Sequence, residues 1–432
     1  MDNNKSPKWL IAVAGVLFAG FTLTVFLVSD NWKFGFISLI SGLFGFILKY
    51  GPFGFTCSFR AIVTKADFSQ MRDMLIFLFV GTLFCSIIEL FSGLYPLFQL
   101  PAKKQYQDSG SSVGISLVLG SFLFGMGMIL GSGCASGTFV GMGGGFIKSY
   151  VVLLFFIIGA TIFALNPFYN FWSKLPKTAA SVQIHFSITL VILIALYGIT
   201  LAIDYFKARN QYQKGPKKEE IDQINTLIPS ENEKMVNDDK KNNTKVEGIK
   251  IKWYSSIRAV IVSSSLGLVI SIFYLCAGKM IGVMGVFPII GANILKLFGA
   301  KPENWDYFKG GISSNVLSLE IFDSDIFMAL GAFIASSIKG NFGTDQCKGI
   351  GEYIKGIIGG LLMGIGARMA GGCNIGAMTS GITSSSIHGF IWMICAILGC
   401  FCSCKIVSFI EKKMKPKNTT NETKEEENSK SK

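Results

Sequence analysis

Charged residues and histidines are scarce in this sequence, and this scarcity narrows the classes of protein to which it can belong. Only 16% of the 432 residues are charged and two are histidine, whereas half are hydrophobic. With only His185 and His388, the chain offers no conventional pair of nucleophile and base. Apolar runs of membrane-spanning length recur throughout. The composition predicts an all-α polytopic membrane protein.

Several motifs that would indicate other activities are missing. The chain has no Cys-x-x-Cys redox pair and no phosphate-binding loop, so we expect no ATP-driven pump within it and no cofactor or metal. Most of the ten cysteines lie in apolar segments, which predicts free thiols rather than disulfides. The net charge of +13 is concentrated at segment ends and in polar connectors, so nucleic acid is not an expected partner.

The apolar segments differ in length. We take as candidate spans the ranges 9–29, 33–49, 74–98, 112–131, 149–165, 185–206, 256–278, 280–298, 326–339, 353–370 and 387–410. The first has no evident cleavage site, so we expect it to be retained. Because a helix needs about 20 residues to cross the bilayer core, 326–339 and the glycine-rich pieces 51–60, 133–146 and 371–383 are too short. We expect about nine transmembrane helices, with the glycine-rich pieces as short helices dipping into the protein interior.

The polar stretches divide the chain into four regions. We predict a first membrane half at 1–206, a hydrophilic linker at 207–252, a second membrane half at 253–411 and a disordered tail at 412–432. Basic residues follow the last apolar segment of each half, and cytoplasmic loops carry an excess of such residues. We therefore expect the linker and the tail to be cytoplasmic and leave the side of the N-terminus open.

Two cysteines framed by glycine occupy corresponding places in the two halves. Cys134 lies in Gly-Ser-Gly-Cys-Ala-Ser-Gly-Thr and Cys373 in Ala-Arg-Met-Ala-Gly-Gly-Cys-Asn-Ile-Gly. A thiol is a weak hydrogen-bond donor, so glycines that weaken a helix around it indicate a substrate passing close by. Such glycines allow close approach to the backbone and open helix N-termini to anions; here they are Gly133, Gly137, Gly371, Gly372 and Gly376. Their alternative role is close packing of helices. Duplicated halves with interrupted helices are typical of transporters.

Arg368 lies five residues before Cys373 in an apolar run. A cation inside a membrane is costly, so it is a functional hypothesis by default. Arg368 would draw an anion or pair with Glu89, and the alternative is that it caps a helix end or reaches the interface. We expect His388, at a helix start, to be a hydrogen-bonding residue at the membrane interface.

Three motifs in order resemble the YeeE/YedE sulfur-transport family. They are Gly-Pro-Phe-Gly-Phe-Thr-Cys-Ser-Phe-Arg around Cys57, together with the glycine-framed sequences around Cys134 and Cys373. The resemblance covers most of both halves and implies uptake of thiosulfate through an hourglass-shaped helical protein in the cell membrane. It also implies that the three thiols hand the anion along a central path, beginning at Cys57, by hydrogen bonds to sulfur. A small cytoplasmic sulfur-carrier protein is the partner that the resemblance implies.

The chemistry suits such an anion, and two alternatives stay open. A thiol meets the diffuse terminal sulfur of thiosulfate at little desolvation cost, and weak repeated sites allow release at each step. A selenium-containing anion would use the same ladder of thiols. A membrane sulfurtransferase would use Cys134 or Cys373 as a nucleophile, with its thiolate favoured by a helix N-terminus. The segment at 282–288, which corresponds to the region of Cys57, has no cysteine, so the predicted site holds three thiols.

Overall fold

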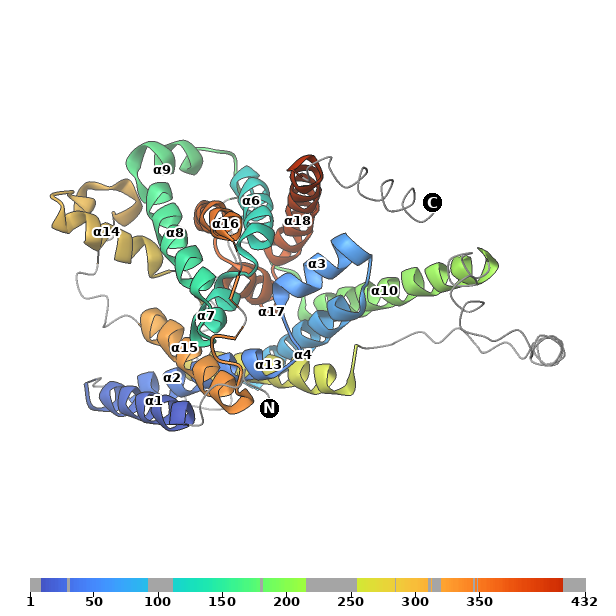
Figure 1. Cartoon of the computed structure of the whole chain (residues 1–432), viewed down its shortest axis with the longest axis horizontal. Helices are drawn as coiled ribbons and strands as arrows, with labels where there is room; N and C mark the ends of the chain where they lie inside the picture. The colour runs from blue at the N-terminus through green and yellow to red at the C-terminus, as the bar shows by residue number, and fades with distance from the viewer. Residues whose placement is uncertain are drawn as a thin grey trace, which may run out of the picture.

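The described part of the chain folds into helices, which confirms the predicted all-α class (Figure 1). A computed structural model describes residues 9–28, 32–91, 112–178, 182–214, 255–283, 285–309, 312, 320–344, 346–347 and 349–414. The tail lies outside these residues. So does most of the predicted linker, except that a helix continues into it as far as Lys214.

Each membrane half contains long helices separated by short ones. The first half consists of α1 (Trp9–Val28), α2 (Trp32–Tyr50), α3 (Phe55–Lys65), α4 (Ser69–Phe91), α6 (Ile115–Gly131), α7 (Ala135–Gly143), α8 (Ile147–Ala164), α9 (Asn166–Ser173) and α10 (Phe186–Lys214). The second half consists of α13 (Ile257–Ala277), α14 (Phe287–Leu297), η2 (Pro302–Asn304), η3 (Asp306–Phe308), α15 (Glu320–Lys339), α16 (Ile350–Met369), η5 (Asn374–Thr379), α17 (Ser380–Thr383) and α18 (Ile387–Met414).

Eight helices within the described residues are long and apolar enough to cross a membrane. The predictions for two of the apolar segments, 280–298 and 326–339, were wrong. The range 280–298 is not a span, because α13 ends at Gly278 in a left-handed conformation and only the 11 residues of α14 follow. The range 326–339 is not short, because α15 begins at Glu320 and has 20 residues. Its first turns carry Asp323 and Asp325, which interrupt the apolar pattern of the sequence without interrupting the helix.

The order of elements in the first half is repeated in the second. In each half a long helix, a short helix, two long helices, a short helical segment and a further long helix follow one another. Contacts repeat as well: α2 packs on α15 as α13 packs on α4, and α8 packs on α16 as α18 packs on α6. The two halves therefore form a structural repeat.

Polar contacts identify the helix ends that share one side of the molecule. The Lys339 ammonium at the end of α15 donates to the Lys49 carbonyl oxygen at the end of α2, 3.3 Å away. The Lys148 ammonium in the first turn of α8 pairs with Glu352 in the first turn of α16. Arg258, in the first turn of α13, lies within electrostatic range of Lys339. Because α2 ends where its counterpart α13 begins, the two repeats have inverted topology.

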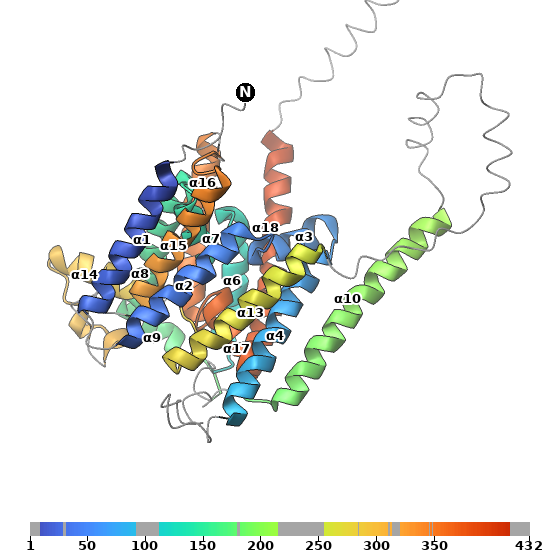
Figure 2. The ribbon, with the colours of Figure 1, turned by 90° about the horizontal axis from the view of Figure 1, so that it is seen from below.

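The ends of α10 and α18 lie on this same side (Figure 2). The Lys207 ammonium of α10 donates to the Ala66 carbonyl oxygen at the end of α3, and the Lys355 ammonium of α16 pairs with Glu411 of α18. Helices α10 and α18, which precede the predicted linker and tail, thus end on one side of the molecule. We call this side the linker side. The short helices α3 and α7 enter the protein from the linker side, whereas α14 follows the opposite end of α13.

Candidate functional site

Cys134 lies at the N-terminal end of α7, directly after the tight turn that ends α6. Helix α6 is capped by Ser132, whose backbone is left-handed (φ 60°); the Ser132 N–H donates to the Ile129 carbonyl and the Gly133 N–H to that of Met128. Cys134 then adopts an extended conformation, and its sulfur accepts a 3.4 Å hydrogen bond from the Gly137 N–H. The thiol is 2% exposed. The N-cap geometry therefore fixes this sulfur in the interior.

Cys373 lies at the equivalent turn of the second half. Gly371 and Gly372 have positive φ angles (75° and 152°), which lets α16 end and the chain turn toward η5. Two side chains of α18 hold this turn: His388 Nε2 lies 3.0 Å from the Ala370 carbonyl oxygen, and Trp392 Nε1–H donates to that of Gly372. The prediction that His388 is interfacial is wrong, because it is 1% exposed. The turn, not the membrane surface, explains this histidine.

Cys57 and Cys134 line the same cavity. Its volume is about 110 Å³, and Gly133 and Gly137 also line it. Unlike Cys134, Cys57 is exposed, and it also borders a larger cavity of about 270 Å³ that continues to Gln70 and Asp73. Cys57 therefore stands between a wider cavity and a narrower one that leads to Cys134.

Cys373 lies beyond this cavity rather than on it. It is 1% exposed and does not line either of the two cavities at Cys57, yet it is within electrostatic range of Cys134. Helix α16 begins on the linker side, and Cys373 follows its last residue. The turn that holds Cys373 therefore lies at the end of α16 that points away from the linker side. In space, the three predicted thiols thus follow one another in the order Cys57, Cys134 and Cys373.

The glycines beside the cysteines differ in the space around them. A Cβ atom added at Gly133, Gly137 or Gly376 would have no neighbour closer than 3.6 Å. Gly372 is different, because a Cβ there would lie 2.8 Å from the Ala377 nitrogen and its positive φ disfavours other residues. An added methyl group would therefore make ordinary van der Waals contacts at Gly133, Gly137 and Gly376, whereas Gly371 and Gly372 shape the backbone.

Arg368 does not pair with Glu89, which corrects that part of the prediction. Its guanidinium donates a 2.8 Å hydrogen bond to the Tyr307 hydroxyl, in an aromatic cluster with Phe163 and Tyr169. Arg368 lies in the last turn of α16, so it is on the side of the membrane opposite the linker. Both hypotheses for Arg368, attraction of an anion and capping of the helix end, are compatible with this position.

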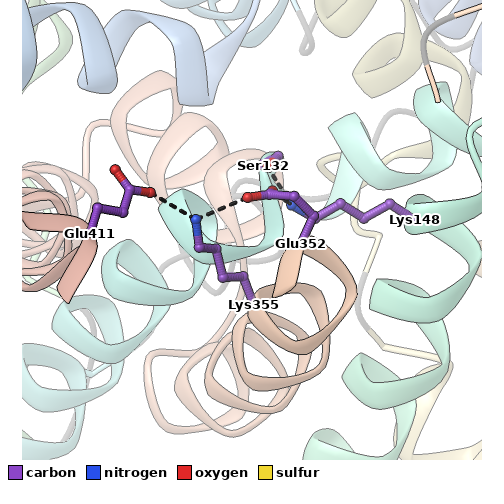
Figure 3. Close-up of polar contacts among 5 residues, drawn as sticks. All are labelled: Ser132, Lys148, Glu352, Lys355 and Glu411. Atoms are coloured by element: carbon purple, nitrogen blue, oxygen red, sulfur yellow. Dashed lines mark hydrogen bonds and ion pairs between the residues drawn. The ribbon is translucent and has the colours of Figure 1, made fainter. Parts of the chain in front are cut away.

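A group of charged residues that the sequence did not reveal contacts Ser132 at the turn before Cys134 (Figure 3). The Lys148 ammonium, 6% exposed, donates to the Ser132 hydroxyl at 2.8 Å and to Glu352 at 2.9 Å. Ser132 lines the cavity of Cys57 and Cys134. Glu352 also pairs with Lys355, which pairs in turn with Glu411. The signal in the sequence is a lysine placed immediately after a glycine-rich segment at the start of an apolar run.

Two inverted helical repeats, with short helices meeting at a cavity lined by thiols, define a polytopic membrane transporter. The chain belongs to the sulphur transport family, whose family model matches residues 50–402. This finding confirms the resemblance that the cysteine motifs indicated.

Named relatives cover most of the chain. It is 27% identical to the thiosulfate transporter TsuA of Spirochaeta thermophila, over 84% of this chain and 95% of that protein. It is 26% identical to the protein of the same name from Escherichia coli, over 83% of this chain and 91% of the relative. A shorter match, 31% identical over 34% of this chain and 37% of the relative, is to the probable transporter YedE of Escherichia coli.

Proposed function

We propose that this protein takes up thiosulfate and relays it past Cys373, Cys134 and Cys57 by hydrogen bonds to their thiols. The observation that carries the proposal is the cavity shared by Cys57 and Cys134, with Cys373 within electrostatic range of the second thiol. Two relatives that align over nearly their whole length are named thiosulfate transporters, which supports this choice of substrate.

The surroundings of Cys134 suit a sulfur anion. Its neighbours are neutral groups, namely the Ser136 hydroxyl, 3.2 Å from the sulfur, and the Gly137 N–H, which donates to it, and the N-terminus of α7 favours negative charge. The terminal sulfur of thiosulfate is a diffuse acceptor that a thiol can meet at little desolvation cost. Each contact is weak, so the anion moves on rather than staying bound, as passage through a pore requires.

We further propose that the linker side faces the cytoplasm of a cell whose plasma or inner membrane holds the protein. Lys49, Lys148, Lys339 and Lys355 lie at helix ends on this side, in accord with the excess of basic residues in cytoplasmic loops. In this orientation, Cys57 opens toward the cytoplasm. The anion then meets the thiols in reverse chain order, and the larger cavity at Cys57 is where a small sulfur-carrier protein would receive it.

Growth on thiosulfate tests the substrate and the relay together. In cells lacking other sulfate and thiosulfate uptake, the wild-type protein is expected to restore growth on thiosulfate as sole sulfur source. Cys57→Ala, Cys134→Ala and Cys373→Ala are each expected to abolish it, because each removes one step of the path. Cys347→Ala, a thiol in the loop between α15 and α16, is the matched control and should grow normally.

Other outcomes separate the alternatives. Normal growth of the Cys57→Ala, Cys134→Ala and Cys373→Ala variants would contradict the thiol relay. If correctly inserted wild-type protein fails to restore growth but accumulates selenium from selenium oxyanions, the substrate is the selenium-containing anion instead. A persulfide trapped on Cys134 or Cys373 during uptake would indicate sulfurtransfer rather than a non-covalent relay.

A further inference from the structure

A buried carboxyl group without a hydrogen-bond partner among the described residues lies near the thiol of Cys373. Asp325 of α15 is 2% exposed, and neither of its carboxyl oxygens has a hydrogen-bond partner among the described residues. Asp325 is within electrostatic range of Cys373. Helix α15 begins on the side opposite the linker. The turn of Cys373 lies at the end of α16 that points toward this same side. An unpaired polar group buried beside the proposed path calls for a functional explanation.

Few charged groups surround Asp325. Helix α15 packs against α1, α2 and α7. Helix α1 has no ionisable residue, α2 has Lys33 and Lys49 in its first and last turns, and α7 contributes the thiol of Cys134 at its N-cap. The Lys49 ammonium lies over the Phe146 ring on the linker side, 4.3 Å from the centroid. Among the side chains that the structure describes, the Cys373 thiol interacts electrostatically with Asp325, whereas Lys49 lies against Phe146 instead.

The other ionisable residues of α15 occupy different positions. Glu320 and Asp323 precede Asp325 in the first turns, and Lys339 ends the helix on the linker side. Asp323 is half-buried and has an interaction partner, in contrast to Asp325. The two aspartates, two residues apart on one helix, thus provide a matched pair for experiment.

We propose that Asp325 carries a proton together with the transported anion, so that uptake is coupled to inward movement of a proton. This inference rests on the proposed function. A bare carboxylate in this position would repel a dianion arriving at Cys373, whereas the protonated acid is neutral and can donate a hydrogen bond. Because linkage is reciprocal, protonation of Asp325 favours anion binding, and the bound anion favours protonation.

The proton balance of the cycle is simple. Water on the outer side supplies the proton to a carboxylate oxygen of Asp325, and the O–H bond breaks again when the anion has left toward the inner side and water reaches the carboxyl group. One proton accompanies each dianion, so a single net negative charge crosses. No oxidant, reductant or further reactant is needed.

The test uses the full-length protein in liposomes with radiolabelled thiosulfate, at zero membrane potential. An outside-acid pH gradient is expected to accelerate net uptake by the wild-type protein and to drive accumulation above the external concentration. Asp325→Asn cannot release a proton, so it should lose both effects while still exchanging internal for external thiosulfate, which requires no net proton movement. Asp323→Asn is the control and should respond to the gradient as the wild type does.

Each result is decisive for one of the two proposals. Gradient-driven accumulation by Asp325→Asn, or wild-type uptake that ignores the pH gradient, would overturn proton coupling and leave thiosulfate transport intact. Loss of exchange as well as net uptake in folded Asp325→Asn would also overturn it, in favour of a direct role in binding. Wild-type liposomes that move no thiosulfate at all would instead contradict the proposed function.

Discussion

The glycines of this protein have two roles, and the space around each residue tells them apart. Gly364 packs α16 against α8 so closely that an added Cβ would lie 2.3 Å from the Phe156 carbonyl oxygen. Gly137, beside the cavity, would place a Cβ 3.6 Å from the Cys134 sulfur with no other atom within 4 Å. The first glycine allows helices to approach, whereas the second leaves room on the proposed anion path.

Substituting these two glycines by alanine should therefore have opposite effects. Gly364→Ala overpacks a helix contact and is expected to cost about 1–3 kcal/mol, reducing the amount of folded protein. Gly137→Ala lies within a helix, where alanine is favoured, so folding should not suffer. It places a methyl group beside the relay sulfur and should slow thiosulfate uptake about tenfold, or ~1.4 kcal/mol.

The measurements are uptake per folded molecule and thermal stability in detergent. Gly282→Ala is the control for overpacking, because a Cβ at this position meets no atom within 4 Å. If Gly137→Ala is unstable but transports normally per molecule, this glycine serves packing and not passage.

At the same scale, the sequence located the thiols but not all their neighbours. Cys134 and Cys373 stand out in the sequence because glycines frame each of them in an apolar segment, and the structure places both at buried turns. Lys148 and Asp325 were missed, since a single charge next to an apolar run looks like the end of a span. Only the fold shows that Lys148 reaches Ser132 and that Asp325 is buried without a hydrogen bond to any side chain or backbone group that the structure describes.

At the scale of elements, the short helices were predictable and some of the long ones were not. The glycine-rich pieces do form short helices, α3, α7 and the η5–α17 segment, because they are too short and too interrupted to span. The errors at α14 and α15 share one cause. Mean hydropathy does not detect the left-handed Gly278 that ends α13, nor does it recognise that aspartates can continue a helix in a protein interior.

The start of α8 is fastened to the start of α16 beside the cavity. Lys148 joins them through Glu352 and also holds Ser132, at the turn that leads to Cys134. Glu352 is 35% exposed, so solvent screens this pair and its contribution is smaller than that of a fully buried pair. We attribute to it the positioning of the turn more than overall stability.

Removing the charge of either Lys148 or Glu352 should loosen the turn at Ser132. Lys148→Met and Glu352→Gln are each expected to destabilise the protein by about 1–2 kcal/mol and to lower uptake, since the Ser132 turn loses its support. The double exchange Lys148→Glu with Glu352→Lys restores the ion pair. It does not restore the hydrogen bond that the Lys148 ammonium donates to Ser132. It should recover stability more fully than uptake, and equal recovery of both would show that the ion pair alone matters.

At the scale of the whole molecule, the inverted repeat is symmetric in its helices and asymmetric in its thiols. The third residue of α3 is Cys57, and the third residue of α14 is Ile289. The linker side therefore has an exposed thiol at this place, and the equivalent place on the other side has isoleucine. Moving a dianion inward against an inside-negative potential costs about 4.6 kcal/mol per 100 mV, which gives a proton-accepting group on the outer half a clear role.

This asymmetry makes the orientation of the protein measurable. With every other cysteine replaced, Cys57 should react with a membrane-impermeant maleimide from the cytoplasmic face and not from outside, because its cavity opens on the linker side. Thiosulfate should slow the reaction by occupying that cavity. A variant whose sole thiol is introduced by Lys279→Cys, at an exposed position just beyond the opposite end of α13, should show the reverse sidedness. Labelling of Cys57 from outside, with the introduced thiol reacting from within, would invert the membrane orientation and with it the order in which the anion meets the three thiols.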